Sequence, residues 1–316
     1  MSEMSAQLTV VEQQDFWTGQ EEVSGRRFSG PRFYPFMQAH SVNLVHMLEE
    51  RVRTLVAKGK LEEAMQACEA AVKQARQIEE VEKNPDSRSE LSYALEVQAD
   101  LHRDEGDYGV ALPLFREALE LISVSEDHLE PRARLRTSLG VCTDYLGQTE
   151  EAMKHYREAI EDFKSMDPPA ELDIADLCNN LAYLLKEEGN VDEAETLYLE
   201  ALQITHTQLG KASEQTATLC NNLGALYLGE GYYNRARDMH LMSLEGRREV
   251  FGEDHPDTAQ SHANLAISLA ELGDDLFARE HYQQAIASFE AAGADYADDL
   301  EVVKENFAHF EAKHPQ

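Results

Sequence analysis

Apolar residues recur at intervals of three and four from about residue 40 to residue 292, and this spacing predicts a series of amphipathic helices. The first face consists of Val42, Val45, Leu48, Val52, Leu55 and Val56. It ends shortly before Gly59, and a second helix is expected from there through Ile78. The pattern therefore predicts pairs of helices joined by short turns.

A longer pattern is repeated in the second half of the chain. Asn-Asn-Leu at residues 179–181 and 221–223, and Ala-Asn-Leu at residues 263–265, are each followed by a glycine. These glycines, Gly189, Gly231 and Gly273, are 42 residues apart. A small residue stands seven positions before each glycine and an alanine five positions after it, as expected where two antiparallel helices approach closely. Each unit is predicted to be a helical hairpin whose apolar face is covered by its neighbours.

The same template extends towards the N-terminus through Gly147, Gly106 and Gly59, so six units cover about residues 42–292. These positions resemble the tetratricopeptide repeat. The resemblance implies an all-α fold, a right-handed superhelical solenoid of six helical hairpins plus a C-terminal capping helix. The expected organisation is a flexible arm over residues 1–39, the repeats over 40–292 and the capping helix over 293–316.

Prolines and the C-terminal segment add detail to this prediction. Pro85, Pro131, Pro168 and Pro256 are each expected in a loop between hairpins. Pro113 instead falls within a predicted helix, where we expect a kink or a late helix start. Residues 295–314 are predicted to form a terminal helix, either a cover for the last hairpin or a partner-binding helix. Its apolar stripe contains Leu300, Val303, Phe307 and Phe310.

A narrower resemblance is to the kinesin light chain family. It rests on the 42-residue period, the paired asparagines and the Gly-Glu-Asp-His-Pro-Asp loop at residues 252–257. Residues 1–39 contain no heptad pattern of the kind that joins a light chain to its motor chain. The architecture is most similar to the bacterial members of this family. That resemblance implies a bacterial tubulin as partner and a role in linking its filaments to membranes.

Composition and charge narrow the range of functions. The chain has 28 Lys and Arg against 60 Asp and Glu, a net charge of −32, which argues against general binding to nucleic acid. The four cysteines show no zinc-binding spacing and are expected to be reduced thiols. Without a signal peptide or an apolar stretch near the ~20 residues of a membrane span, the expected location is cytoplasmic, with peripheral membrane contact left open.

Catalytic motifs are missing from the sequence. It contains no phosphate-binding loop, no His-Glu-x-x-His and no Gly-x-Ser-x-Gly, and its histidines are scattered. We therefore expect a non-catalytic adaptor that binds a protein partner, with no cofactor, metal or small-molecule substrate. A regulator that sequesters a short peptide is a further alternative.

The resemblance places the first helix of each hairpin on a concave groove. The groove residues it implies are Asn179, Asn180, Tyr183, Asn221, Asn222 and Asn264. An asparagine amide both donates and accepts hydrogen bonds, so a ladder of them could clamp the backbone of an extended peptide. The alternative is that the asparagines bond to neighbouring helices and brace the repeats. A carboxylate clamp, which some members of the repeat family carry, is missing most of its Lys and Asn residues here.

Residues 25–37 contrast with the acidic chain, since they combine arginines and aromatic rings without an acid. One interpretation is a weak anchor on anionic lipid; the other is a cover for the open first hairpin. The residues concerned are Arg26, Arg27, Phe28, Arg32, Phe33, Tyr34 and Phe36.

Overall fold

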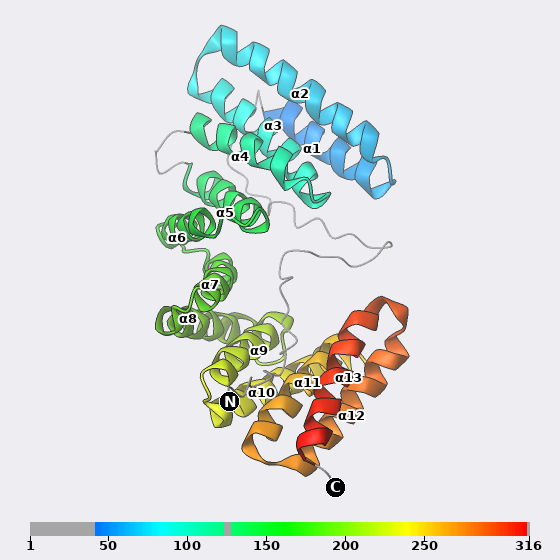
Figure 1. Ribbon diagram of the computed structural model, residues 1–316. Coiled ribbons are helices and arrows are strands. Elements are labelled where there is room, and N and C mark those ends of the chain that lie inside the picture. Colours follow the sequence, from blue (N-terminus) through cyan, green and yellow to red (C-terminus); the bar gives the residue numbers. More distant parts are fainter. Residues whose placement is uncertain (1–41, 123–127, 315–316) are drawn as a thin grey trace, which may run out of the picture. The chain divides into compact units, whose positions relative to one another are not determined.

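The structure is a computed structural model that describes residues 42–122 and 128–314. Within these ranges it contains thirteen α-helices and one short 3₁₀-helix, η2 (Ala294–Tyr296), and no strand (Figure 1). The α-helices are α1 (Val42–Ala57), α2 (Leu61–Glu82), α3 (Pro85–Asp104), α4 (Tyr108–Leu121), α5 (Leu129–Tyr145), α6 (Thr149–Lys164), α7 (Glu171–Glu187), α8 (Val191–Leu209), α9 (Glu214–Gly229), α10 (Tyr233–Phe251), α11 (Pro256–Leu272), α12 (Asp275–Ala292) and α13 (Ala297–Lys313). Two compact units divide between Asp173 and Ile174. The predicted all-helical series of hairpins is confirmed.

The six repeat glycines lie in the turns between the two helices of each hairpin. All six have positive φ, a conformation that a side chain would resist: Gly59 (69°), Gly106 (82°), Gly147 (71°), Gly189 (77°), Gly231 (75°) and Gly273 (79°). The second helix begins two residues later in every hairpin. The spacing of these glycines in the sequence therefore gives the positions of the turns.

Small residues lie where the two helices of a hairpin touch. The alanines five positions after each glycine, Ala64, Ala111, Ala152, Ala194, Ala236 and Ala278, are completely buried. A Cβ atom on Gly140 would overlap the ring of Tyr156, which packs across from α6, and one on Gly224 would overlap His240. Close approach thus explains the small residue seven positions before the turn glycine.

Three prolines that were expected in loops lie instead in the first turns of helices. Pro85 and Pro256 are the first residues of α3 and α11, and Pro131 is the third residue of α5. A proline is tolerated there because the first N–H groups of a helix have no partner within it. Asn84 accepts from the backbone N–H of Ser87 over 2.8 Å and caps α3. The loop prediction was therefore wrong for these three residues, whereas Pro168 lies between α6 and α7 as expected.

Of the two alternatives predicted at Pro113, a kink or a late helix start, the late start is wrong. Helix α4 begins at Tyr108, two residues after Gly106, and continues through Pro113. At 14 residues it is the shortest of the thirteen α-helices in the described ranges. In a helix, the backbone N–H of residue 113 would donate to the carbonyl four residues earlier. Proline has no N–H, so one carbonyl in the first turn of α4 lacks that hydrogen bond.

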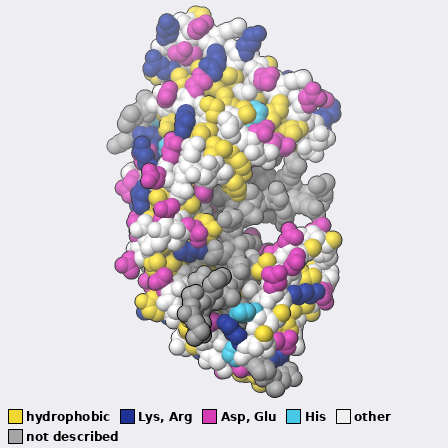
Figure 2. All heavy atoms as spheres, in the orientation of Figure 1, with side chains coloured by type: hydrophobic (Ala, Val, Ile, Leu, Met, Phe, Trp, Pro, Cys, Tyr) yellow, Lys and Arg dark blue, Asp and Glu magenta, His cyan; other side chains and the backbone are white. Residues whose placement is uncertain are grey.

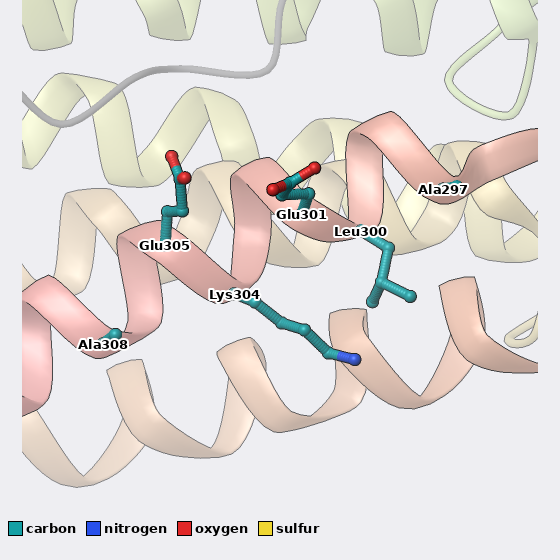
Figure 3. Close-up of a pocket in the computed structure, with 6 residues that line it drawn as sticks. All are labelled: Ala297, Leu300, Glu301, Lys304, Glu305 and Ala308. Carbon is teal, nitrogen blue, oxygen red and sulfur yellow. The ribbon is translucent and has the colours of Figure 1, made fainter.

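Helix α13 lies on the last hairpin. Val303 and Phe310 are buried with Tyr282 and Phe289 of α12, and Leu300 and Phe307 pack against the same cluster. The predicted apolar stripe is therefore the face that packs. Figure 3 shows Lys304 reaching towards the neighbouring helix, where it bonds Glu290 of α12 over 2.6 Å, while Glu301 and Glu305 point away. An apolar inner face and a polar outer face suit the last element of a repeat array.

The surface carries charges of both signs, with acids in excess. On the face that Figure 2 shows, Asp and Glu side chains are spread over both units and alternate with Lys, Arg and apolar areas. Among the helices of the described ranges, none combines the length and the apolar character needed to cross a bilayer.

Candidate functional site

The candidate site lies on the first helices of three successive hairpins, α7, α9 and α11, in the unit that begins at Ile174. Helix α9 is buried over residues 216–227, and α11 over residues 258–270. Both helices lie between neighbouring helices, so even their polar side chains are shielded and need internal partners. The paired asparagines belong to this set.

Four asparagines form a crossed ladder between neighbouring hairpins. Nδ2 of Asn222 donates to Oδ1 of Asn179 over 3.0 Å. Nδ2 of Asn264 donates to Oδ1 of Asn221 over 2.8 Å. In both bonds, the second asparagine of one hairpin reaches the first asparagine position of the hairpin before it. The four side chains are buried, and their bonds join α9 to α7 and α11 to α9.

Two of the predicted groove residues are less buried. Asn180 is half-buried, and its Oδ1 is 3.4 Å from Nδ2 of Asn179. Tyr183, one turn further along α7, is also half-buried, with Nζ of Lys186 5.0 Å from the centre of its ring. These two side chains are accessible at the end of the ladder.

Asn221 has an unused donor. Its Oδ1 accepts from Asn264, but its own Nδ2 has no hydrogen-bond acceptor among the described residues, although the side chain is fully buried. A buried amide donor without an acceptor costs about 1–3 kcal/mol. Because this atom is shielded inside the repeats, an ordered water is the kind of acceptor that fits it.

His240 of α10 lies next to this ladder. Its ring packs on Gly224, and Nδ1 is 2.8 Å from Oγ of Ser268. The corresponding position in the neighbouring hairpins holds Tyr198 and Tyr282. Burial lowers the pKa of His240 to about 4, so the ring is neutral at pH 7. Sequence reasoning missed this histidine, and its place nine residues after the turn glycine, where the neighbouring repeats hold tyrosine, was the signal that could have found it.

In the other unit, ion pairs join the first helices α3 and α5. Arg134 makes two hydrogen bonds to Glu96, each of 3.0 Å, and Nη1 of Arg103 donates to Oγ of Ser138 over 3.0 Å. Arg103 also lies 2.8 Å from Asp100, whose pKa burial raises to about 7. Glu96 precedes its turn glycine by ten residues, as Asn179 and Asn221 do. Sequence reasoning missed this network, and the shared register was the signal that could have found it.

The other sequence-based predictions concern the arm, the thiols and metal binding. Residues 25–37, including all seven arm residues named above, lie outside the described residues. The four cysteines are buried and none is in a disulfide, and burial raises the pKa of Cys68, Cys142 and Cys220 to about 12. Over residues 42–122 and 128–314, no group of His, Cys, Asp and Glu is arranged to hold a metal ion.

Comparisons with known proteins agree with this architecture. The tetratricopeptide repeat family model matches residues 90–165, 173–249 and 221–291. No curated protein matches the sequence. Among solved structures, BtubC (BKLC) from P. vanneervenii is 27% identical, with a TM-score of 0.61 over 73% of this chain and 92% of that one.

Two further solved structures share the fold at lower identity. The putative kinesin light chain repeats of Podospora anserina are 18% identical, with a TM-score of 0.54 over 64% of this chain and 95% of that one. The apo form of the quorum sensor NprR from B. thuringiensis is 15% identical, with a TM-score of 0.63 over 86% of this chain and 71% of that one.

Proposed function

Because the chain belongs to the tetratricopeptide repeat family, whose members bind protein partners, we propose that it is an adaptor holding an extended segment of a partner along α7, α9 and α11. The observation that carries this proposal is the accessible end of the asparagine ladder, where Asn180 and Tyr183 of α7 are half-buried beside the buried Asn179. The Asn180 amide can both donate to and accept from the backbone of an extended segment.

The ladder holds its accessible end in place. Oδ1 of Asn180 lies 3.4 Å from Nδ2 of Asn179, whose own Oδ1 accepts from Asn222 of α9 over 3.0 Å. A side chain that is already oriented loses little freedom when it binds. Tyr183, also half-buried and one turn further along α7, would extend the contact along the segment.

For the partner, we propose a bacterial tubulin-type filament. Support comes from the resemblance to bacterial kinesin light chains and from the likeness to BtubC over 92% of that chain. Asn180, at the accessible end of the ladder, would contact the partner's backbone and leave its side chains to the surrounding surface. Specificity for one filament would then depend on exposed residues beside the ladder.

Co-sedimentation tests the proposal. Purified bacterial tubulin is assembled with GTP and mixed with the protein, which is expected to pellet with filaments and to stay in the supernatant with unassembled subunits. The Asn180→Ala/Tyr183→Ala variant should raise Kd by about tenfold, equivalent to roughly 1.4 kcal/mol. The matched control is Asn234→Ala/Tyr232→Ala, which changes exposed residues of the same types at the start of α10. No pelleting by wild type, or equal weakening by both double variants, would reject the proposal.

A further inference from the structure

The first hairpin has a groove that the other described elements leave open. Helix α2 forms its floor, with Ala67, Ala70 and Ala71 in the middle and Ile78 towards one end. Leu48 of α1 and Ala94 of α3 lie along its sides. Because the floor side chains are small, the groove has room for larger apolar groups.

The C-terminal end of α2 exposes an apolar side chain among several acidic ones. Val81 is 83% exposed, the highest value among the large apolar side chains of the described ranges. The last turn also contains Glu79, Glu80 and Glu82, and no basic residue. Carboxylates at a helix C-terminus face the negative end of the helix dipole, so a nearby cation would stabilise this turn. Arg88 lies 3.8 Å from Glu79 and supplies one such cation.

We propose that residues 25–37 of the same chain dock on this groove. Three rings within residues 33–36 match the apolar floor. Arg26, Arg27 and Arg32 match the acids at the end of α2 together with Glu63 and Glu90, which line the groove beside a single cation, Arg51. The segment contains no acid that would repel them. Docking covers the exposed end of the repeats, as a terminal element should.

The length of chain allows this docking. Helix α1 begins at Val42, and Leu48, which lines the groove, is in its second turn. Only residues 38–41 separate the proposed docking segment from α1. At about 3.3 Å per extended residue, those four residues reach roughly 13 Å, and the groove from residue 67 to residue 78 is about 17 Å long at 1.5 Å per helical residue. The docking does not depend on what the asparagine ladder binds.

Disulfide trapping tests the contact. Phe36→Cys is combined with Gln74→Cys, which faces the groove, or with Lys73→Cys, an exposed neighbour that does not line it. The four native cysteines are buried, so the engineered pair should react first under mild oxidation. We expect an intramolecular disulfide to form at least tenfold faster with Cys at position 74 than at 73. Equal rates would overturn the proposal, and a disulfide-linked dimer would mean that a second copy supplies the segment.

A second measurement needs no engineered cysteine. Amide hydrogen exchange across α2 should be several-fold faster in a chain lacking residues 1–39, and also in Arg26→Glu/Arg27→Glu/Arg32→Glu, than in wild type. Exchange across α12, in the other unit, serves as the internal control. Vesicles of phosphatidylglycerol and phosphatidylcholine separate docking from lipid anchoring. If wild type pellets with the vesicles while exchange in α2 is the same with and without the arm, the segment is a lipid anchor and the docking proposal is wrong.

Discussion

Asn264 donates from Nδ2 to Oδ1 of Asn221 over 2.8 Å, and this bond joins two hairpins at residues 43 apart in the sequence. The Asn222 to Asn179 bond repeats the same step one hairpin earlier. Each ladder bond therefore fixes how far one hairpin is displaced against the next. The same bond buries the Asn221 side chain between the two hairpins, where it braces the repeats.

Removing a ladder donor should destabilise the protein. Asn264→Ala leaves Oδ1 of Asn221 buried without its donor, and we expect a loss of about 1–3 kcal/mol in the free energy of unfolding. Asn180→Ala should cost less than half of that, because Asn180 is half-buried. Urea unfolding followed by circular dichroism measures both. Equal losses would show that the ladder bond adds nothing to stability.

A methyl group should have opposite effects at two helical glycines. Gly140→Ala would drive a Cβ into the ring of Tyr156 and cost about 1–3 kcal/mol. Gly109→Ala in α4 meets nothing within 4 Å and should stabilise the protein by about 0.5–1 kcal/mol, because alanine favours the helix. Thermal melts of the two variants give the comparison, and destabilisation by both would contradict the packing explanation.

His240 should make the protein sensitive to acid. Its pKa is about 4 when folded, against about 6.5 for an unfolded histidine, so the unfolded chain binds more protons between these values. Stability is full above pH 6.5 and falls as the pH drops towards 4. The loss at pH 5 is on the order of 2 kcal/mol from this residue. Burial also lowers the pKa of His281 to about 4, which adds loss in the same direction.

His240→Tyr should reduce this acid sensitivity. In an earlier repeat, the ring of Tyr156 packs on Gly140 in the way that His240 packs on Gly224. A tyrosine ring therefore fits at this position of the repeat. Urea midpoints at pH 7.5 and pH 5 should differ less in the variant than in wild type. His206→Gln, at an exposed position, is the control and should behave as wild type. An unchanged pH dependence in His240→Tyr would remove His240 as its source.

Helix α13 should be needed to cover the last hairpin. Phe310→Ala removes a buried ring that packs against Tyr282, and we expect a loss of about 3–5 kcal/mol. Phe277→Ala, at a ring that is 54% exposed on α12, should change stability by no more than about 0.5 kcal/mol. Deleting residues 295–316 should lower the melting temperature and cause aggregation, since it exposes the same cluster. A deletion variant that stays monomeric and melts unchanged would show that α13 is not a cover.

The sequence by itself determined the hairpins and their turns. A turn that needs positive φ selects glycine, and a close helix contact selects glycine or alanine; both requirements are local and recur with the repeat. The period could therefore be read from Gly189, Gly231 and Gly273, and the structure places all three in turns. The apolar stripe of α13 was predictable because the last hairpin has no further repeat to cover it. A terminal helix with one apolar face supplies that cover.

Only the tertiary structure decided which polar groups meet. The repeat is 42 residues long, but the ladder joins residues 43 apart, because neighbouring hairpins meet one position out of register. A period identifies equivalent positions, but it does not contain this offset, which depends on how helices pack. The Glu96–Arg134 pair and the burial of His240 depend on the same packing. Hydrogen bonds tolerate displacements of only a few tenths of an ångström, so their partners follow from the packed helices and not from the pattern.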